Sequence, residues 1–109
     1  MPSPVFLGEF EQIVLIAILK LQGDTGVLAL KAQLDDIAGR TTSRGALYRT
    51  LDRLADKGWI DWDVDHERRP ERGGHPKRQL RVTRTGLAVL KASRRTLLGL
   101  WSGLEKELS

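Results

Sequence analysis

Cationic side chains recur at helical spacing in the middle of this chain, where they could bind an anion. Between Arg44 and Lys57, apolar residues recur at helical spacing and leave a polar set on the opposite face, namely Arg44, Gly45, Tyr48, Arg49, Asp52 and Arg53. The guanidinium group of arginine presents a planar fork of N–H donors, which fits both phosphate and the edge of guanine. Thr42 and Ser43 precede this predicted helix, and a helix N-terminus favours phosphate. The pattern indicates a surface that binds nucleic acid, with contacts from Thr42, Ser43, Arg44, Tyr48, Arg49 and Arg53.

A second group of cations follows in a segment rich in proline and glycine, which predicts the tip of a β-hairpin. Its basic residues and their neighbours would meet phosphate or a minor groove, and the candidates are Arg68, Arg69, Arg72, His75, Lys77 and Arg78. Residues 40–84 hold twelve Arg and Lys against seven Asp and Glu, a net charge of +5, whereas the remaining residues have a net charge of −1. Taken alone, such a basic run is equally consistent with a solvated loop.

Hydrophobic periodicity predicts the elements that would position these side chains. Helices are expected over Gly8–Leu21, Val27–Ala38 and Arg44–Lys57, strands over Trp59–Val64 and Lys77–Val82, and a long final helix from Thr83 or Thr85 to about Leu108. The expected fold class is mainly α with a small β-wing, a winged helix-turn-helix whose third helix fits the major groove of DNA. The expected division is a winged-helix DNA-binding domain at residues 1–82 and a C-terminal dimerisation helix at residues 83–109, packed with the first helix.

The final predicted helix carries an apolar seam at heptad spacing. Its members are Leu87, Leu90, Arg94, Leu97, Trp101, Leu104 and Leu108, and Arg94 is the one break. The first predicted helix is apolar on nearly all sides and must therefore be covered on more than one side. A domain of this size also gains stability from a subunit partner. We therefore expect a homodimer, with an interface that includes Phe10, Leu15, Leu19, Leu90, Leu97, Trp101 and Leu104.

Trp101 has two interpretations. A tryptophan within an apolar seam packs in the core of an interface, which is the simpler role. An aromatic wall also favours flat apolar guests, so Trp101 is a candidate residue for binding a small aromatic effector.

Composition excludes several other classes of protein. With 109 residues and 12.2 kDa, the chain suits one compact domain. Its net charge of +4 and its pI of about 9.9 favour polyanionic partners. The absence of cysteine removes disulfides and thiolate chemistry, and it makes the cytoplasm the expected location. The longest apolar stretch, Ile13–Leu19, is far shorter than the ~20 residues that span a membrane.

Groups for catalysis or metal binding are not apparent in the sequence. His66 and His75 lie nine residues apart with no cysteine to join them, which disfavours a metal site. Asp35 and Asp36 are adjacent, so they point to different sides of their helix and cannot form an acid and base pair. No glycine motif for a nucleotide cofactor occurs. We therefore expect no enzymatic activity, no cofactor and no metal.

Two segments resemble the PadR family of bacterial transcriptional regulators. The first is SRGALYRTLDRLADKGWI, which contains the family's recognition-helix pattern G-A-[LVI]-Y-x-x-L-x-R-L, and the second is RGGHPKRQLRVTRTGLAVL, which is similar to its wing. The resemblance runs from Leu7 to about Glu105 and departs at Gln79 and Leu80, where the family commonly has two tyrosines. It implies a homodimeric repressor with a C-terminal dimerisation helix. Some relatives respond to small aromatic compounds, which favours an effector site at Trp101.

Two hypotheses follow for the function. In the first, a homodimeric repressor binds double-stranded DNA at an inverted repeat, with its two third helices in major grooves about one helical turn, ~34 Å, apart. In the second, the same helix and hairpin dock on an acidic protein surface. The two are separable because base-reading arginines set a sequence preference among DNA sites, whereas protein docking has no such preference.

Overall fold

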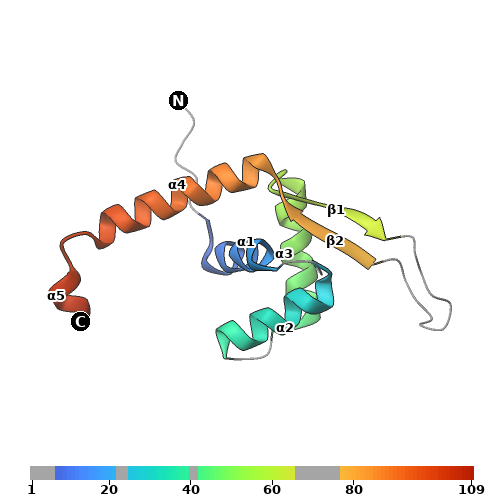
Figure 1. The fold of residues 1–109 in the computed structure, drawn as a ribbon, viewed down its shortest axis with the longest axis horizontal. Helices are drawn as coiled ribbons and strands as arrows, with labels where there is room; N and C mark the ends of the chain where they lie inside the picture. Colours follow the sequence, from blue (N-terminus) through green and yellow to red (C-terminus); the bar gives the residue numbers. More distant parts are fainter. Residues whose placement is uncertain (1–6, 22–24, 40–41, 66–76) are drawn as a thin grey trace.

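The computed structural model describes residues 7–21, 25–39, 42–65 and 77–109, and its elements follow the predicted order. The helices are α1 (Glu9–Lys20), α2 (Val27–Ala38), α3 (Arg44–Asp56), α4 (Arg84–Trp101) and α5 (Glu105–Leu108). The strands β1 (Ile60–Asp65) and β2 (Lys77–Val82) form an antiparallel pair, which we call the wing. In Figure 1, α1, α2 and α3 are grouped together and the wing extends to one side. The predicted fold, mainly α with a small β-wing, is confirmed.

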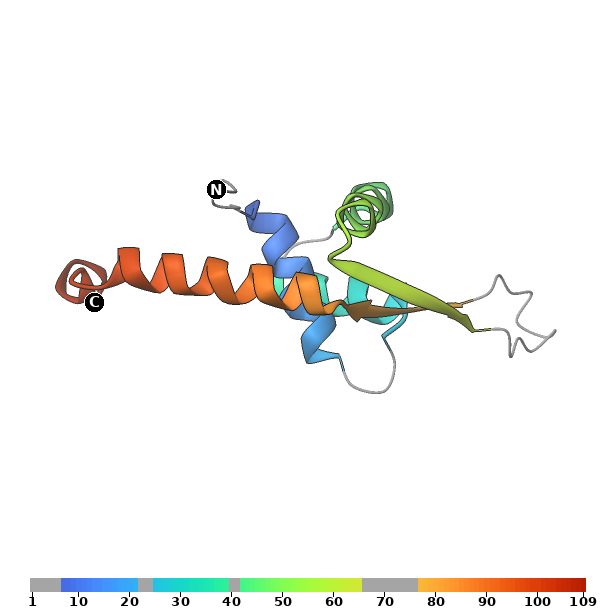
Figure 2. The same ribbon diagram turned by 90° about the horizontal axis from the view of Figure 1, so that it is seen from above.

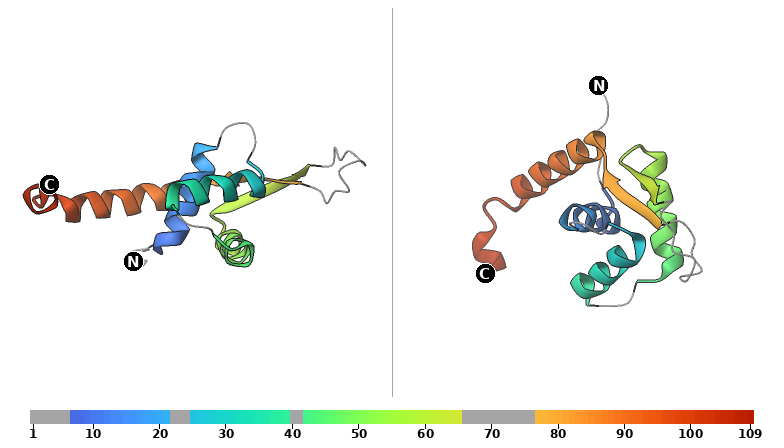
Figure 3. Two further views of the ribbon diagram at one scale, coloured as in Figure 1. Left: turned by 90° about the horizontal axis from the view of Figure 1, so that it is seen from below. Right: turned by 45° about the vertical axis from the view of Figure 1, so that its right-hand side comes forward.

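The core lies where α1 passes between the other helices. Figure 3 shows α1 between α4 and α2, and the buried side chains of α1 are Val14, Leu15, Ala17 and Ile18. They pack with buried residues of α2, of α3 and of the sheet, namely Leu30, Leu34, Leu47, Leu51, Leu54, Trp59, Ile60 and Leu80. A helix that is apolar on nearly all sides is thus covered on several sides by its own chain.

Leu15 corrects one expectation for the dimer interface. Its side chain is fully buried within the chain, so a partner cannot reach it, and its assignment to the interface is wrong. Phe10, another expected interface residue, is half-buried against the same core. The large apolar side chains that α1 leaves exposed are Ile16 and Leu19, at 39% and 48%. Leu15 is buried while Ile16 is exposed because successive residues of a helix are rotated by about 100°, so adjacent positions face different neighbours.

Asp35 holds the end of α2 against the segment that leads into α3. Its carboxylate accepts hydrogen bonds from the Thr42 amide at 2.7 Å and from Lys31 Nζ at 2.8 Å. The bond from Lys31, followed by the bond from the Thr42 amide, lowers the pKa of Asp35. Ser43 then caps α3, because its Oγ accepts from the Ala46 amide at 3.1 Å. These contacts determine where α3 begins.

Asp35→Ala is expected to lower the melting temperature at pH 7 by roughly a few degrees, because the Thr42 amide loses its acceptor. A carboxylate with a lowered pKa stabilises the fold above the unfolded pKa, near 3.8, and this contribution is lost as the pH falls through the lower folded pKa. The gap between wild type and variant should therefore shrink in acid, which thermal unfolding at pH 7 and at pH values below 3.8 would measure. Asp36→Ala, at an exposed position beside Asp35 in α2, is the control with little effect. A gap of equal size in acid would contradict the assignment.

The outer edge of β2 is secured by Thr25. The strands pair from Ile60 opposite Val82 to Asp65 opposite Lys77, and Leu80 is fully buried. The Leu80 amide donates to the Thr25 carbonyl at 3.1 Å. The Gln79 Oε1 accepts from the amide and the hydroxyl of Thr25, at 3.2 and 3.0 Å. Gln79 and Leu80, where the PadR family commonly has two tyrosines, therefore bond the wing to Thr25, which precedes the start of α2.

α4 projects away from the wing. In Figure 2 the two elements extend in opposite directions from the group formed by α1, α2 and α3. The buried residues of α4 are Gly86, Leu90 and Ser93, all in its first ten residues. The radius of gyration is 16.2 Å, against about 13 Å for a compact chain of this length. The second half of α4 thus extends beyond the core of its own chain.

The end of α4 corrects a second expectation. The helix ends at Trp101 and does not continue to Leu108. The Ser102 amide bonds the Leu98 carbonyl at 3.0 Å, and Gly103 then takes a φ of +90°, which favours glycine. The chain resumes as α5, so Leu104 and Leu108 do not continue the seam on one straight helix.

Candidate nucleic-acid interface

α3 exposes the polar set that its helical period predicts. We call Arg44, Gly45, Tyr48, Arg49, Asp52 and Arg53 the outward face of α3, and all of them are exposed. Ser43, the residue that caps the helix, is exposed beside them. The opposite face is buried at Leu47, Leu51 and Leu54. The helix therefore anchors itself in the core by one face and presents N–H donors and an aromatic ring on the other.

Thr42 is placed differently from its neighbours. Only 9% of it is exposed, and its amide is already bonded to Asp35. A phosphate contact by this residue, expected from its place before the helix, does not fit the structure. The reason is that the Thr42 amide donates to the Asp35 carboxylate, a contact between residues of different segments that helical spacing alone does not reveal.

Among the described residues, the arginines of the outward face have no carboxylate partner. Within the described ranges, no ion pair holds Arg44, Arg49 or Arg53, although Asp52 and Asp56 lie on the same helix. Arg53 donates to the Thr50 hydroxyl at 3.2 Å. An exposed helical arginine can pair with an aspartate of its own helix, and neither Arg49 nor Arg53 does so among the described residues. The charges on this face thus remain available to an external anion.

The two faces of the wing differ in charge. Arg81 pairs with Asp61 at 2.9 Å and with Asp63, and the hydrogen bond from Arg81 lowers the pKa of Asp63. These three residues share one face, because side chains alternate along paired strands. Arg78 is on the opposite face, and its Cζ lies 4.5 Å from the ring centroid of Trp62 and 5.7 Å from that of Tyr48. The aspartates therefore neutralise one face and leave Arg78 on the face toward α3.

The other predicted wing residues are placed only in part. Lys77 is the first residue of β2, opposite Asp65. Arg68, Arg69, Arg72 and His75 lie outside the described residues. Sequence reasoning missed Trp62, which stacks on Arg78. The signal was the antiparallel register, because Trp62 and Arg78 fall on the same face once the two strands are paired.

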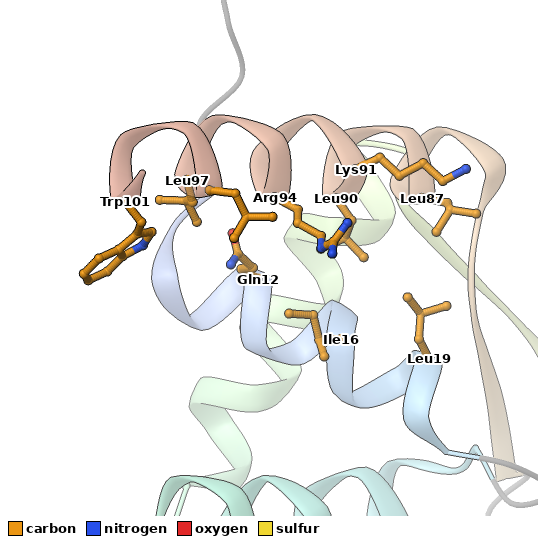
Figure 4. Close-up of a pocket in the computed structure, with 10 residues that line it drawn as sticks. Gln12, Ile16, Leu19, Leu87, Leu90, Lys91, Arg94, Leu97 and Trp101 are labelled. Carbon is orange, nitrogen blue, oxygen red and sulfur yellow. The ribbon is translucent and has the colours of Figure 1, made fainter. Parts of the chain in front are cut away.

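A groove runs between α1 and α4 (Figure 4). Its volume is about 370 Å³, and its lining residues are Gln12, Ile16, Leu19, Leu87, Leu90, Lys91, Arg94, Leu97, Leu98 and Trp101. Ser93 donates to the Gln12 Oε1 at 2.6 Å and so joins the two helices. Three of the expected interface residues, Leu19, Leu97 and Trp101, are exposed along this groove. Leu90 also lines the groove but is buried by its own chain. Leu104 is exposed and lies beyond the end of α4.

Neither a metal-binding cluster nor a membrane-spanning helix is found among the described residues. In the part of the chain that the structure describes, no group of three His, Cys, Asp or Glu side chains could hold a metal ion. Over the same residues, every helix is too short or too polar to cross a membrane. The outward face of α3, the wing and the α1–α4 groove are thus the candidate functional surfaces among the described residues.

Solved structures with the same fold include two transcriptional regulators. A PadR family transcriptional regulator from Eggerthella lenta is 25% identical, with a TM-score of 0.67 over 93% of this chain and 87% of its own. A PadR-like transcription factor from Bacteroides fragilis is 19% identical, with a TM-score of 0.62 over 91% and 85%. The circadian clock associated protein Pex from Anabaena is 23% identical, with a TM-score of 0.52 over 92% and 86%. The last two likenesses show the fold alone.

The family assignment comes from the sequence. No curated protein matches the chain. The model of the transcriptional regulator PadR-like family matches residues 15–92, from the middle of α1 into α4. That span is well over half of the chain and includes the outward face of α3 and both strands of the wing. The chain therefore belongs to the PadR-like family of transcriptional regulators.

Proposed function

We propose that the protein is a homodimeric repressor that binds double-stranded DNA at an inverted repeat. The observation that carries the proposal is the outward face of α3, where Arg44 and Arg49 are exposed and hold no ion pair with any described carboxylate. An α-helix fits the major groove, and an unpaired guanidinium can donate two hydrogen bonds to guanine. The wing, beside α3, would follow the phosphates. Repression would be steric, because the bound dimer occupies promoter DNA.

Selection of bound sequences from random duplex DNA tests this function. The expected result is an inverted repeat whose half-sites are about one helical turn, ~10 base pairs, apart. Contacts with roughly six to eight phosphates per dimer would give log affinity against log salt a slope of about −5 to −7. Recovery of random sequences only, or an affinity that does not change with salt, would contradict the proposal.

Arg44→Ala and Arg49→Ala are each expected to weaken binding to the selected site by about 5- to 100-fold, because a lost base contact costs roughly 1–3 kcal/mol. Binding to random DNA should change much less, so the preference for the selected site falls. Fluorescence anisotropy with both duplexes measures the two affinities. Arg81→Ala is the matched control, because Arg81 is neutralised on the other face of the wing. Equal and small losses from all three variants would favour docking on an acidic protein instead.

Gly45→Ala is expected to separate stability from DNA affinity. The added Cβ would meet only the flexible end of Arg49, with Nη1 at 3.3 Å. Alanine favours a helix by about 1 kcal/mol over glycine, so the fold should be as stable or more stable. In the major groove of DNA, the same methyl group would hold the N-terminal turn of α3 away from the bases. We therefore expect about a tenfold loss of affinity for the selected duplex. Urea unfolding and anisotropy measure the two effects, and unchanged affinity would contradict this docking geometry.

The α1–α4 groove supports the homodimer. Ile16, Leu19, Leu97 and Trp101 are between 39% and 50% exposed, and they line one continuous apolar surface. Tryptophan is enriched in the buried core of interfaces between protein subunits. A second copy of the chain would cover it and would place two α3 helices on one DNA molecule. This interface retains Leu19, Leu97 and Trp101 from the expected set and replaces Leu15 with Ile16.

Ligand control is the remaining part of the proposal. Trp101 is half exposed at the end of the groove, where a flat aromatic effector could stack on its indole ring. A ligand that binds one arrangement of the subunits better than another would shift the dimer toward it and change its affinity for DNA. An aromatic dye should quench the tryptophan fluorescence of the wild type and quench Trp101→Phe much less. Equal quenching of both proteins would show that Trp101 does not bind the dye, and its role would then be packing in the interface.

A further inference from the structure

Arg78 is held between two aromatic rings that belong to different elements. Its Cζ lies 4.5 Å from the ring centroid of Trp62, on β1, and 5.7 Å from that of Tyr48, on α3. Arg78 itself is on β2. The group therefore joins both strands of the wing to the outward face of α3, and we call Tyr48, Arg78 and Trp62 the aromatic clamp.

Arg78 has no anionic partner within the described residues. Its Nη1 is buried and makes no hydrogen bond there. The nearby carboxylates of Asp61 and Asp63 are bonded to Arg81 on the opposite face of the wing. Trp62 is half-buried and packed against the core, so one side of the clamp is rigid. Ring faces thus provide the surroundings that a carboxylate usually provides for a guanidinium.

The position of Nη1 argues against a role as a simple phosphate contact. A buried nitrogen cannot reach the DNA backbone without leaving the clamp. The planar guanidinium can stack on aromatic faces, whereas the compact and strongly hydrated ammonium of lysine cannot reproduce that arrangement. Tyr48, by contrast, is 40% exposed on the outward face of α3. The clamp therefore connects a half-buried wing residue, whose Nη1 is buried, with an exposed residue at the expected DNA surface.

We propose that Arg78 is a positioning residue that fixes the wing against α3 and orients Tyr48 for reading DNA. This inference rests on the proposed DNA-binding function and adds to it the source of part of its sequence preference. Loss of the clamp would let the wing and α3 move independently. Binding would then keep its attraction to phosphate and lose discrimination between sites.

The first experiment compares Arg78→Lys and Arg78→Met by anisotropy on the selected duplex and on random duplex over a range of salt concentrations. Both variants are expected to lower the ratio of the two affinities by about tenfold. For random DNA, the salt slopes of both variants should equal that of the wild type, because Arg78 is not expected to contact a phosphate. A phosphate contact gives a different result, because lysine would restore binding and methionine would reduce the salt slope by about one. Full rescue by lysine would overturn the proposal. Arg81→Lys, outside the clamp, is the control and should leave the ratio unchanged.

The second experiment needs no DNA. A double-mutant cycle of Tyr48→Leu and Arg78→Met, followed by urea unfolding, measures the coupling across the clamp. The expected coupling is about fivefold in the unfolding equilibrium constant, whereas Tyr48→Leu combined with Arg81→Met should be additive. Additivity in both pairs would overturn the clamp whatever the DNA results. If the wild type binds no DNA while the coupling is present, the proposed function fails and the reading role of Arg78 fails with it, but the clamp itself stands.

Discussion

Gly86→Ala is expected to lower the free energy of unfolding by about 3 kcal/mol, the upper part of the usual range for overpacking. Gly86 is buried in the first turn of α4, and a Cβ at this position would lie 2.1 Å from the Trp59 carbonyl oxygen and 3.0 Å from Val82 Cγ1. The first of these atoms belongs to the backbone and cannot rotate away. The same carbonyl accepts the Thr83 amide at 2.9 Å, so α4 would have to shift from the position where it leaves the wing.

Gly99→Ala is the matched control for this prediction. It lies in the same helix, and a Cβ there meets nothing within 4 Å. Replacing an exposed helical glycine should raise stability by about 1 kcal/mol. Urea unfolding monitored by circular dichroism, at one fixed protein concentration, compares the two variants with the wild type. A loss of less than about 1 kcal/mol for Gly86→Ala would show that the contact between α4 and Trp59 is looser than described.

Leu97→Glu is expected to raise the dissociation constant of the dimer by at least about 100-fold. Leu97 lines the α1–α4 groove and is 39% exposed. A two-fold interface contains the residue twice, and an unpaired carboxylate buried among apolar side chains costs several kcal/mol, of which about 2.7 kcal/mol gives the 100-fold change. Sedimentation at micromolar concentration should find monomers. Affinity for the inverted repeat should fall as well, because the two half-sites are then bound independently.

Ala92→Glu adds the same charge at an exposed position of α4 that does not line the groove. It should leave the dimer intact. Its circular dichroism spectrum and that of Leu97→Glu should both match the wild type, which separates dissociation from unfolding. A Leu97→Glu protein that remains dimeric would place the interface elsewhere, and then the outward faces of two α3 helices would need another means of alignment.

Helical and strand periods predicted most of the fold from the sequence. α3 follows directly from Leu47, Leu51 and Leu54, because residues three and four apart share a face, and the exposed arginines follow from the same rule. The order of elements and the pairing of the wing were also predictable. The end of α4 was not predictable in this way, because the apolar spacing of Trp101 and Leu104 continues past Gly103, where the chain leaves the helix.

Local backbone geometry and chain order can be read from the amino acids, and they are enough to assign residues to the faces of each element and to place a cationic helix directly before a cationic hairpin. Three features could be seen only once the elements were packed: Leu15 is covered within the chain, the Thr42 amide is bonded to Asp35, and Arg78 lies over the rings of Trp62 and Tyr48. Each of these outcomes depends on a residue from another element. Burial and pairing are set by which elements pack together, and periodicity within one element carries no information about that.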